Sequence, residues 1–457
     1  MVNKLKKISC EQYIYIFIVV LSLIITLFFT SNFSVLVVQG ILSIITMPFI
    51  LTKSLKSARV YIIIYVLALF FVFLFYYGNK EKFGIPYFMG GSDDLTYENN
   101  ALTLFNLNIY SVQKAISWGI LPYFHNSLFY VMFLTWVIKF SSFIDGYSTF
   151  LPRIINVFFL LWSTLIFEYL LHKHTKFTDN RIHLSLLFFA IMPSILFINS
   201  FIFRDTFNLL QILSTVYLFD KMIEEKNLMK LSLYLVVIIS VVLITFYTRK
   251  NSLYFSALIC CFTLVQKFKQ EKLYILIPVI LPILSVSGIL EKLGFGLYNQ
   301  VYTSAIISNA NIGLSKFIFE QPLVPFGIIL RGMYILFSPF PDFWNLFLSP
   351  NAYLLDFGTF LIYCGVVIQI LISPFLIKRV LKFDWISISF VTVILGIITT
   401  TFTFRQAILY YPFMAALGVD GYLSTTKKNR FSILIYTIII ASVLVIIYRL
   451  LKISRGY

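Results

Sequence analysis

The chain has few charged residues, and few of the side chains that usually bind metals or form disulfides. Only 12% of its 457 residues are Asp, Glu, Lys or Arg, and the mean hydropathy is +0.90. These values exclude a soluble globular domain. The chain has four cysteines, two of them adjacent at Cys260 and Cys261, and their spacing predicts neither a disulfide framework nor a metal site.

Hydrophobic residues make up 60% of the chain and occur in long runs. The runs are close to the length of a helix that crosses a bilayer, and strand-like alternation is absent. We therefore predict an all-α fold: a polytopic helical integral membrane protein with a single multispanning domain over residues 1–457. The runs predict roughly 13 transmembrane helices. They also predict two large external loops, residues 78–126 and 291–322.

The basic residues indicate which ends of the helices face the cytoplasm. The formal net charge of +17 is compatible with nucleic-acid binding, but Lys and Arg cluster in short loops between apolar runs. This is the positive-inside pattern of membrane proteins, so we expect no nucleic-acid partner. The first two predicted spans are residues 13–30 and 33–51. Because Lys53, Lys56 and Arg59 precede the third predicted span, residues 60–77, that span runs outward. The segment that follows it is then external.

One polar stretch, residues 90–100, interrupts the apolar runs on the external side. It contains Asp93, Asp94 and Glu98 together with amide and hydroxyl side chains. Carboxylates this dense beside a bilayer are costly unless they lie at the aqueous edge and have a function, so the stretch is a candidate site. The alternative is a solvated external loop that binds nothing.

Further charged residues fall on the same external side, although the orientation rule disfavours cations there. Arg204 and Asp205 follow one predicted span, residues 183–200, Arg249 and Lys250 follow another, and Arg405 lies at a late external turn. Basic residues placed against the orientation trend are candidates for binding an anion, whereas anchoring at the membrane edge is the alternative. We predict that these residues, far apart in the sequence, meet the acidic stretch on one external rim.

Such a rim suits a reaction on a lipid-linked phosphate. Arginine binds phosphate bidentately and stays charged near lipid, and a carboxylate can take the proton from an acceptor hydroxyl. Stabilising the charge that develops on a polyprenyl phosphate or diphosphate leaving group would be the largest catalytic contribution. The sequence has no Walker motif, Rossmann fingerprint or nucleophile elbow, which agrees with a donor that is not a soluble nucleotide. Whether a divalent cation binds Asp93 and Asp94 stays open.

Several short motifs resemble those of multispanning proteins of bacterial surface-polysaccharide synthesis. They are Asp93-Asp94 followed by Tyr97, Arg204-Asp205-Thr206 after Pro193-Ser194, the run from Arg331 to Pro341, and Arg405 before Tyr411-Pro412. The layout is similar to O-antigen or capsule repeat-unit polymerases and to C-type, polyprenyl-phosphate-dependent glycosyltransferases.

The resemblance implies roles for individual residues. In the transferases an acidic pair in the first external loop is the base, which implies catalytic roles for Asp93 and Asp94. In the polymerases external arginines matter most, which implies substrate binding by Arg249 and Arg405. The full set of predicted substrate-binding residues is Tyr97, Arg204, Asp205, Arg249, Lys250, Arg331 and Arg405.

The resemblance also implies a function: joining polyprenyl-diphosphate-linked oligosaccharide repeat units on the external face of the bacterial cytoplasmic membrane. The expected partners are the lipid-linked saccharide, the bilayer and, as a candidate, a chain-length regulator protein. No cofactor is expected apart from the open question of a divalent cation. Two alternatives remain. One is a C-type glycosyltransferase that adds a single sugar, and the other is a lipid-linked oligosaccharide flippase or transporter, which would bury charges in mid-span.

Overall fold

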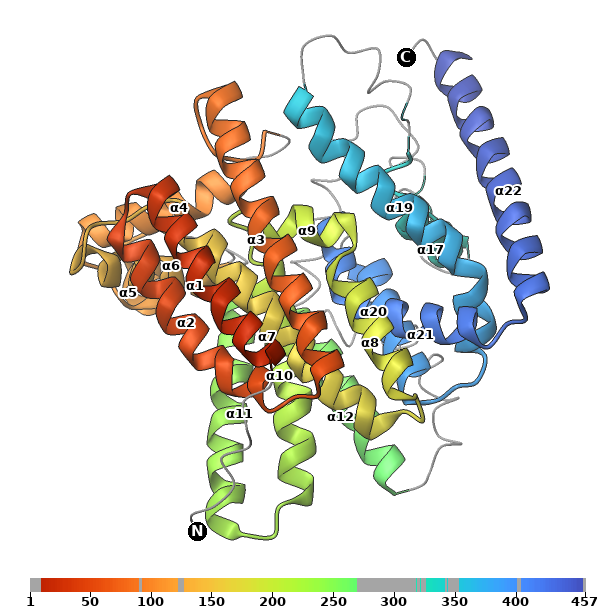
Figure 1. Ribbon diagram of the computed structural model, residues 1–457, viewed down its shortest axis with the longest axis horizontal. Helices are drawn as coiled ribbons and strands as arrows, with labels where there is room; N and C mark the ends of the chain where they lie inside the picture. The colour runs from red at the N-terminus through yellow and green to blue at the C-terminus, as the bar shows by residue number, and fades with distance from the viewer. Residues whose placement is uncertain are drawn as a thin grey trace.

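The described part of the protein is entirely helical in its regular elements. The computed structural model describes residues 10–89, 93–121, 127–268, 326–341, 353–400 and 404–454, together with Ile318, Gln321 and Phe343. The helices within these ranges confirm the predicted all-α class (Figure 1). The predicted second external loop, residues 291–322, lies outside the described residues except for two positions.

The helices, in chain order, are α1 (Cys10–Thr30), α2 (Phe33–Leu51), α3 (Leu55–Phe83), α4 (Asp93–Asn106), α5 (Val112–Ser117), α6 (Leu128–Ser142), α7 (Leu151–His174), α8 (Asp179–Ala190), α9 (Pro193–Asn199), α10 (Asp205–Glu224), α11 (Leu228–Thr248), α12 (Ser252–Lys267), α17 (Ile328–Phe337), α19 (Tyr353–Val380), α20 (Trp385–Thr400), the 3-10 helix η3 (Phe404–Leu409), α21 (Tyr411–Leu423) and α22 (Lys427–Ser454).

Seven of the described helices are long and apolar enough to cross a bilayer: α1, α2, α3, α7, α11, α19 and α22. The bent pair α8 and α9 gives an eighth span if it is counted as one. The protein is therefore a multi-pass membrane protein. The predicted count of roughly 13 crossings is not confirmed, because the other apolar helices, α6, α12, α17 and α20, have only 10–17 residues. At about 1.5 Å per residue such helices are shorter than the hydrocarbon core of about 30 Å.

Several turns between helices lie together at one end of the bundle, which we call the basic end. Ser57 near the start of α3 forms a hydrogen bond with His183 on α8 (Oγ to Nε2, 2.6 Å). Lys173 at the end of α7 pairs with Asp220 on α10 (2.5 Å), and Lys267 at the end of α12 donates to a carbonyl of α10. In Figure 1 the α7–α8 and α10–α11 turns point down, whereas the far end of α3 points up.

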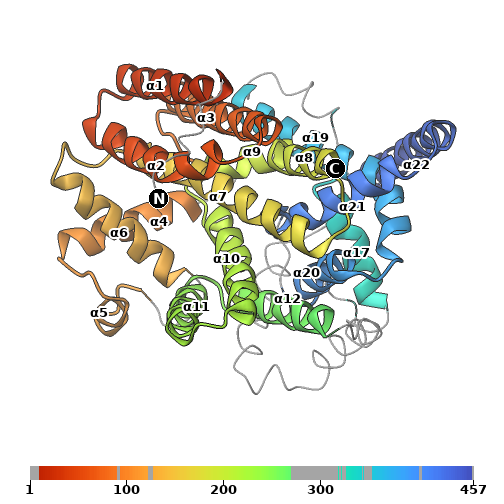
Figure 2. The same cartoon turned by 60° about the horizontal axis from the view of Figure 1, so that its bottom comes forward.

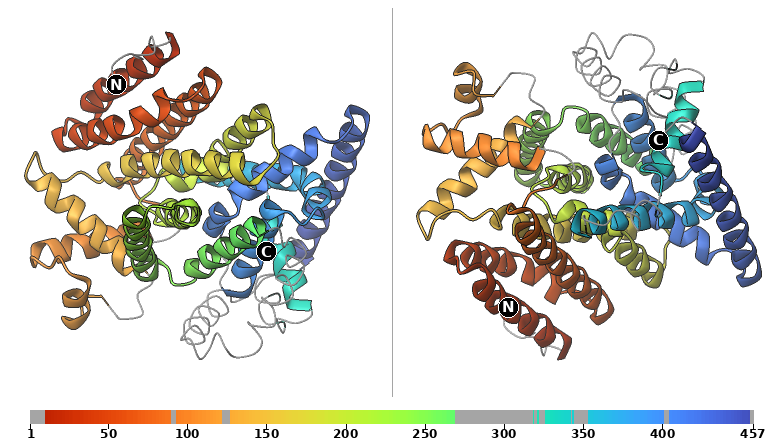
Figure 3. Two further views of the ribbon diagram at one scale, coloured as in Figure 1. Left: turned by 90° about the horizontal axis from the view of Figure 1, so that it is seen from below. Right: turned by 90° about the horizontal axis from the view of Figure 1, so that it is seen from above.

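The segment predicted as the first external loop, residues 78–126, is mostly helical in its described part. α3 runs past its predicted end at residue 77 and stops at Gly84, whose φ of +74° favours glycine. α4 then packs against α6 over a small apolar core that contains Tyr97 and Leu104. The α4–α6 segment stands at one side of the main bundle (Figure 3). The acidic stretch is therefore held by packing and is not a free loop.

The span predicted for residues 183–200 is two helices that meet at an angle of 55°. Pro193 begins α9, and because proline has no N–H and disfavours helical geometry in the residue before it, α8 ends first. α9 packs closely on α19, since a Cβ atom on Gly365 would lie 1.9 Å from the Ser194 hydroxyl. The chain leaves α9 and reaches α10 through Arg204, at the end of the bundle opposite the basic end.

Candidate functional site

The acidic residues of the candidate stretch begin α4. Asp93 and Asp94 lie in its first turn, where the helix dipole favours negative charge. Asp94 is fully buried, and its carboxylate accepts hydrogen bonds from the backbone N–H groups of Phe88 (2.9 Å) and Leu95 (3.0 Å). Burial raises the pKa of Asp94, and the charge of Arg153 and the backbone hydrogen bonds only partly offset this. Asp94 therefore stabilises the first turn of α4 and does not face solvent.

Asp93 reaches across the molecule to a late turn of the chain. Its carboxylate forms an ion pair with Arg405 of η3, 312 positions later in the sequence. The Arg405 guanidinium also lies over the ring of Phe203, 4.4 Å from the ring centroid. The Asp93 side chain keeps 49% of its surface exposed, and that of Arg405 keeps 18%. This pair is accessible, in contrast to Asp94.

A second group of charges surrounds the start of α10. Arg249, directly after α11, forms an ion pair with Asp205 in the first turn of α10 (3.3 Å), and both side chains are almost fully buried. Arg204 precedes Asp205 and donates hydrogen bonds to the Thr248 carbonyl (3.1 Å) and to the Ser127 hydroxyl. Three helix ends, those of α6, α10 and α11, are joined by these contacts.

The two groups form one cluster, because η3, which carries Arg405, packs against α10, whose first residue is Asp205. We call the combined set the rim cluster: Asp93, Arg204, Asp205, Arg249 and Arg405. It lies opposite the basic end, since α10 and α11 run from these residues to the turn that meets Lys173. Three arginines and two aspartates leave one formal positive charge on the cluster.

The other predicted site residues have different environments. Tyr97 lies on the buried side of α4, where its ring meets the edge of Tyr130 (centroids 5.5 Å apart). The Lys250 ammonium lies over the ring of Phe246, 5.1 Å from the centroid. Arg331 lies on α17, whose main neighbours are α19 and α20. Lys250 thus makes a packing contact, whereas Tyr97 both packs on Tyr130 and lies near enough to act electrostatically on Arg405 of the rim cluster. Among the described helices the main neighbours of α17 do not include η3, α10 or α11, so Arg331 lies on a helix apart from the rim cluster.

Arg153 is a buried residue of this region that sequence reasoning missed. It lies in the first turn of α7 with no exposed surface and donates hydrogen bonds to the carbonyls of Ser200 (2.8 Å), Thr149 (3.3 Å) and Pro86. These contacts join the chain before α4 to the chain before α10, and so hold the two halves of the rim cluster together. In the sequence, the feature that could have identified Arg153 is its position at the start of an apolar run.

Glu98 belongs to the predicted candidate stretch, but no individual role was predicted for it from the sequence. It lies one turn after Asp94 on the same face of α4, is fully buried, and neither carboxylate oxygen has a hydrogen-bond partner. The hydroxyls of Tyr87 and Tyr147 lie beside it. Burial raises the pKa of Glu98, and the two tyrosines and Arg153 lower it by less. The spacing of four residues from Asp94 was the signal in the sequence.

The aspartate pair does not fit a shared metal site. Asp93 pairs with Arg405, whereas both oxygens of Asp94 accept backbone hydrogen bonds. Within the ranges that the structure describes, no group of three or more His, Cys, Asp or Glu side chains could hold a metal ion. No step of the chemistry is therefore routed through a divalent cation.

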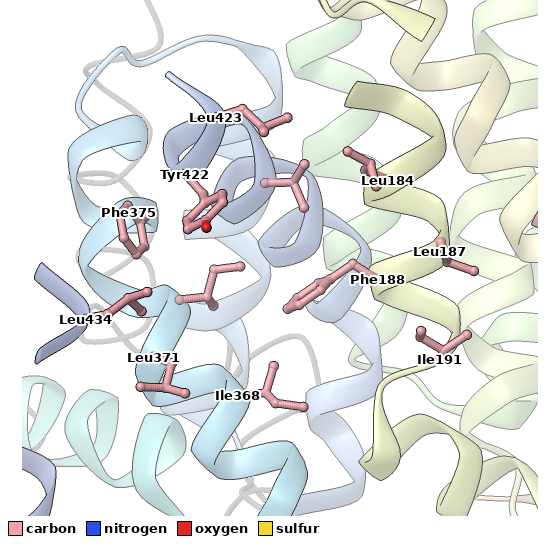
Figure 4. Close-up of a pocket in the computed structure, with 12 residues that line it drawn as sticks. Leu184, Leu187, Phe188, Ile191, Ile368, Leu371, Phe375, Tyr422, Leu423 and Leu434 are labelled. Carbon is pink, nitrogen blue, oxygen red and sulfur yellow. The ribbon is translucent and has the colours of Figure 1, made fainter. Parts of the chain in front are cut away.

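An apolar cavity of about 440 Å³ lies away from the rim cluster, between α8, α19, α21 and α22 (Figure 4). Its lining includes Leu187, Leu371, Leu423 and Leu434. Such a lining suits a hydrocarbon chain and offers no group for acid–base chemistry.

The fold and the rim cluster define the class of the protein. It is an all-helical, multi-pass membrane protein with its clustered basic turns at one end and an arginine-rich cluster at the other. No family model, curated protein or solved structure matches the chain.

Proposed function

We propose that the protein is a membrane glycosyl-transfer enzyme of bacterial surface-polysaccharide synthesis. It joins oligosaccharide repeat units carried on polyprenyl diphosphate. The observation that carries the proposal is the rim cluster, where Arg204, Arg249 and Arg405 converge from separate parts of the chain beside the accessible carboxylate of Asp93. Arginine forks match the oxygens of a phosphate or diphosphate, and they keep their charge beside lipid.

The chemistry divides between the arginines and Asp93. The carboxylate of Asp93 takes the proton of an acceptor hydroxyl, and the hydroxyl oxygen bonds to the anomeric carbon of the donor sugar. The bond from that carbon to the diphosphate oxygen breaks, and the diphosphate leaves with the bonding electrons. The arginines stabilise the negative charge on this leaving group. Asp93 suits the role better than Asp94, because its side chain is half exposed.

The orientation rule gives the proposal its place in the cell. Basic turns face the cytoplasm, so the rim cluster faces outward from the bacterial cytoplasmic membrane, where soluble nucleotide donors are absent. The finer topology of roughly 13 crossings and a chain-length regulator as partner belong to this proposal. Transfer of a single sugar from polyprenyl phosphate, the C-type reaction, would use the same arginines and the same base. The accessible carboxylate of Asp93 at the start of α4 favours this single-sugar transfer as the second candidate function.

The proposal can be tested on a gel of surface polysaccharide from the producing cells. Asp93→Asn and Arg405→Ala should reduce the ladder to one capped repeat unit, with normal protein levels. Asp179→Asn is the matched control, because this aspartate is 79% exposed and begins α8 at the basic end. A full ladder of altered repeats would indicate single-sugar transfer. A normal ladder in both rim variants would overturn the proposal.

A further inference from the structure

α10 carries a polar face that continues inward from the rim cluster. Asp205, Asn208, Gln211 and Thr215 recur every three to four residues and lie on one side of the helix. All four side chains are buried. α10 lies between α11 and α12 in the bundle (Figure 2). A polar face inside an apolar bundle needs partners or a function.

Many polar atoms beside this face have no hydrogen-bond partner. Both amide atoms of Asn199 and of Asn208, the Oε1 atom of Gln211 and the hydroxyl of Ser252 are buried and unpaired. Their side chains are 0–4% exposed. We call these four residues the amide seam. Buried polar groups in native proteins are almost always paired with protein or water, so such a concentration indicates a site that binds something polar.

The amide seam begins directly at the rim cluster. Gln211 donates through Nε2 to the Thr248 hydroxyl (3.2 Å), and the Thr248 carbonyl accepts from Arg204 (3.1 Å). Asn208 lies one turn after Asp205, which pairs with Arg249. A molecule whose phosphate lies at the arginines would therefore present its neighbouring groups to the amide seam.

The chemistry of the amide seam is neutral. It offers carboxamides and one hydroxyl, which both donate and accept hydrogen bonds, and none of its four members is charged. This pattern complements the hydroxyl groups of a sugar, and it suits neither a second phosphate nor a metal cation. Helix α11 packs along α10, and its two buried side chains, Thr245 and Thr248, lie at the end next to the rim cluster.

We propose that the amide seam is the saccharide subsite of the rim cluster, in which Asn208 and its neighbours bind hydroxyl groups of the lipid-linked sugar. The inference rests on the proposed function and extends it from the phosphate to the sugar. The unpaired amides are then kept because the substrate supplies their missing partners.

Paired substitutions distinguish this role from a structural one. Asn208→Leu removes unpaired polar atoms, so the melting temperature in detergent should stay equal or rise, whereas the polysaccharide ladder should fall at least tenfold. Asn156→Leu is the matched control, because its buried amide donates to the carbonyls of Phe201 (2.8 Å) and Phe203 (3.3 Å) and the melting temperature should drop. An equal drop for Asn208→Leu would make its role structural and overturn the proposal.

The ladder also separates the two proposals. If Asp93→Asn and Arg405→Ala remove the ladder while Asn208→Leu leaves it intact, the proposed function holds and the saccharide subsite is wrong. If none of the three variants changes the ladder, the proposed function fails and the subsite fails with it.

Thiol labelling supplies a second measurement that does not depend on catalysis. Asn208→Cys and Ser252→Cys are made in a variant without the four native cysteines and treated with a membrane-impermeant methanethiosulfonate. Both should react. Thr164→Cys, at a fully buried position whose hydroxyl bonds its own helix at 2.8 Å, should not. Protection of both seam cysteines to the level of Thr164→Cys would mean that no polar ligand enters, and would contradict the proposal.

Discussion

Replacing Glu98 by glutamine should stabilise the protein at neutral pH. Glu98 is fully buried on α4 and its two carboxylate oxygens accept no hydrogen bond. Burial is the main cause of its raised pKa. Tyr147, Tyr87 and Arg153 lower the pKa by less than burial raises it, and the neighbouring Asp94 raises it further. Glutamine has nearly the same shape and no charge, so the substitution removes the cost of an ionised carboxylate at this position.

The sign and size of the effect follow from the raised pKa of Glu98. A carboxyl whose pKa is higher in the folded than in the unfolded protein contributes its full stabilisation when the pH is below its pKa in the unfolded protein, which for glutamate is ordinarily 4.5. That stability is lost as the pH rises through the folded pKa. An unsatisfied buried polar group costs about 1–3 kcal/mol, and more if it is charged. Glu98→Gln should therefore raise the free energy of unfolding by about 1–3 kcal/mol at neutral pH, with the gain shrinking toward acid.

The assay is thermal unfolding of the purified protein in detergent, at about pH 5 and about pH 8, for the wild type and two variants. Asp94→Asn is the control: the pKa of Asp94 is also raised, but asparagine has a single acceptor oxygen and leaves one of the two backbone N–H groups facing an NH2 group, so this variant should lose stability at pH 8. A loss of stability for Glu98→Gln at pH 8, as large as that of the control, would refute the reasoning. Glu98 would then be ionised and well paired.

Two further predictions concern packing at the basic end. Gly421→Ala should lower the melting temperature in detergent, because its Cβ atom would lie 2.2 Å from the carbonyl oxygen of Phe375, and overpacking costs about 1–3 kcal/mol. Gly40→Ala, with nothing within 4 Å of the new Cβ, should leave the melting temperature unchanged, and an equal drop would contradict this. Asp420→Ala should cost about 1.5–3 kcal/mol in the same assay, because the buried guanidinium of Arg379, now 2.5 Å away, loses one of its two carboxylate partners and keeps Asp384, while Arg181 loses its ion pair with Asp420. A cost below 1 kcal/mol would show that the ion pair is weak.

Helix boundaries could be predicted from the sequence where an apolar run ends in a turn. The first two spans, Tyr13–Thr30 and Phe33–Leu51, match the predicted residues, because only the turn between them interrupts the apolar sequence. The end of α3 could not be predicted from hydropathy, since Lys80 and Lys82 continue the helix beyond the apolar run. The bend at Pro193 was visible as a proline, but its effect depends on how α9 packs against α19.

The candidate site could be predicted in part for a different reason. Arg204, Arg249 and Arg405 were predicted as site residues because they are cations on the external side, against the orientation trend. The structure brings all three into one cluster. The distinct environments of neighbouring aspartates could not be predicted, because Asp94 turns into the core while Asp93 pairs with a residue 312 positions away. Contacts across such separations depend on the fold, and sequence spacing carries no information about them.

The most direct test of the account is glycosyl transfer by the purified protein in liposomes, with a synthetic polyprenyl-diphosphate oligosaccharide as both donor and acceptor. The account predicts that the wild-type protein lengthens the saccharide. It also predicts that Arg405→Ala lowers the rate by about 10²–10³-fold while the protein still unfolds cooperatively, because one cation facing the leaving diphosphate is lost. Absence of transfer by the wild-type protein, or a rate within twofold of wild type for Arg405→Ala, would contradict the account.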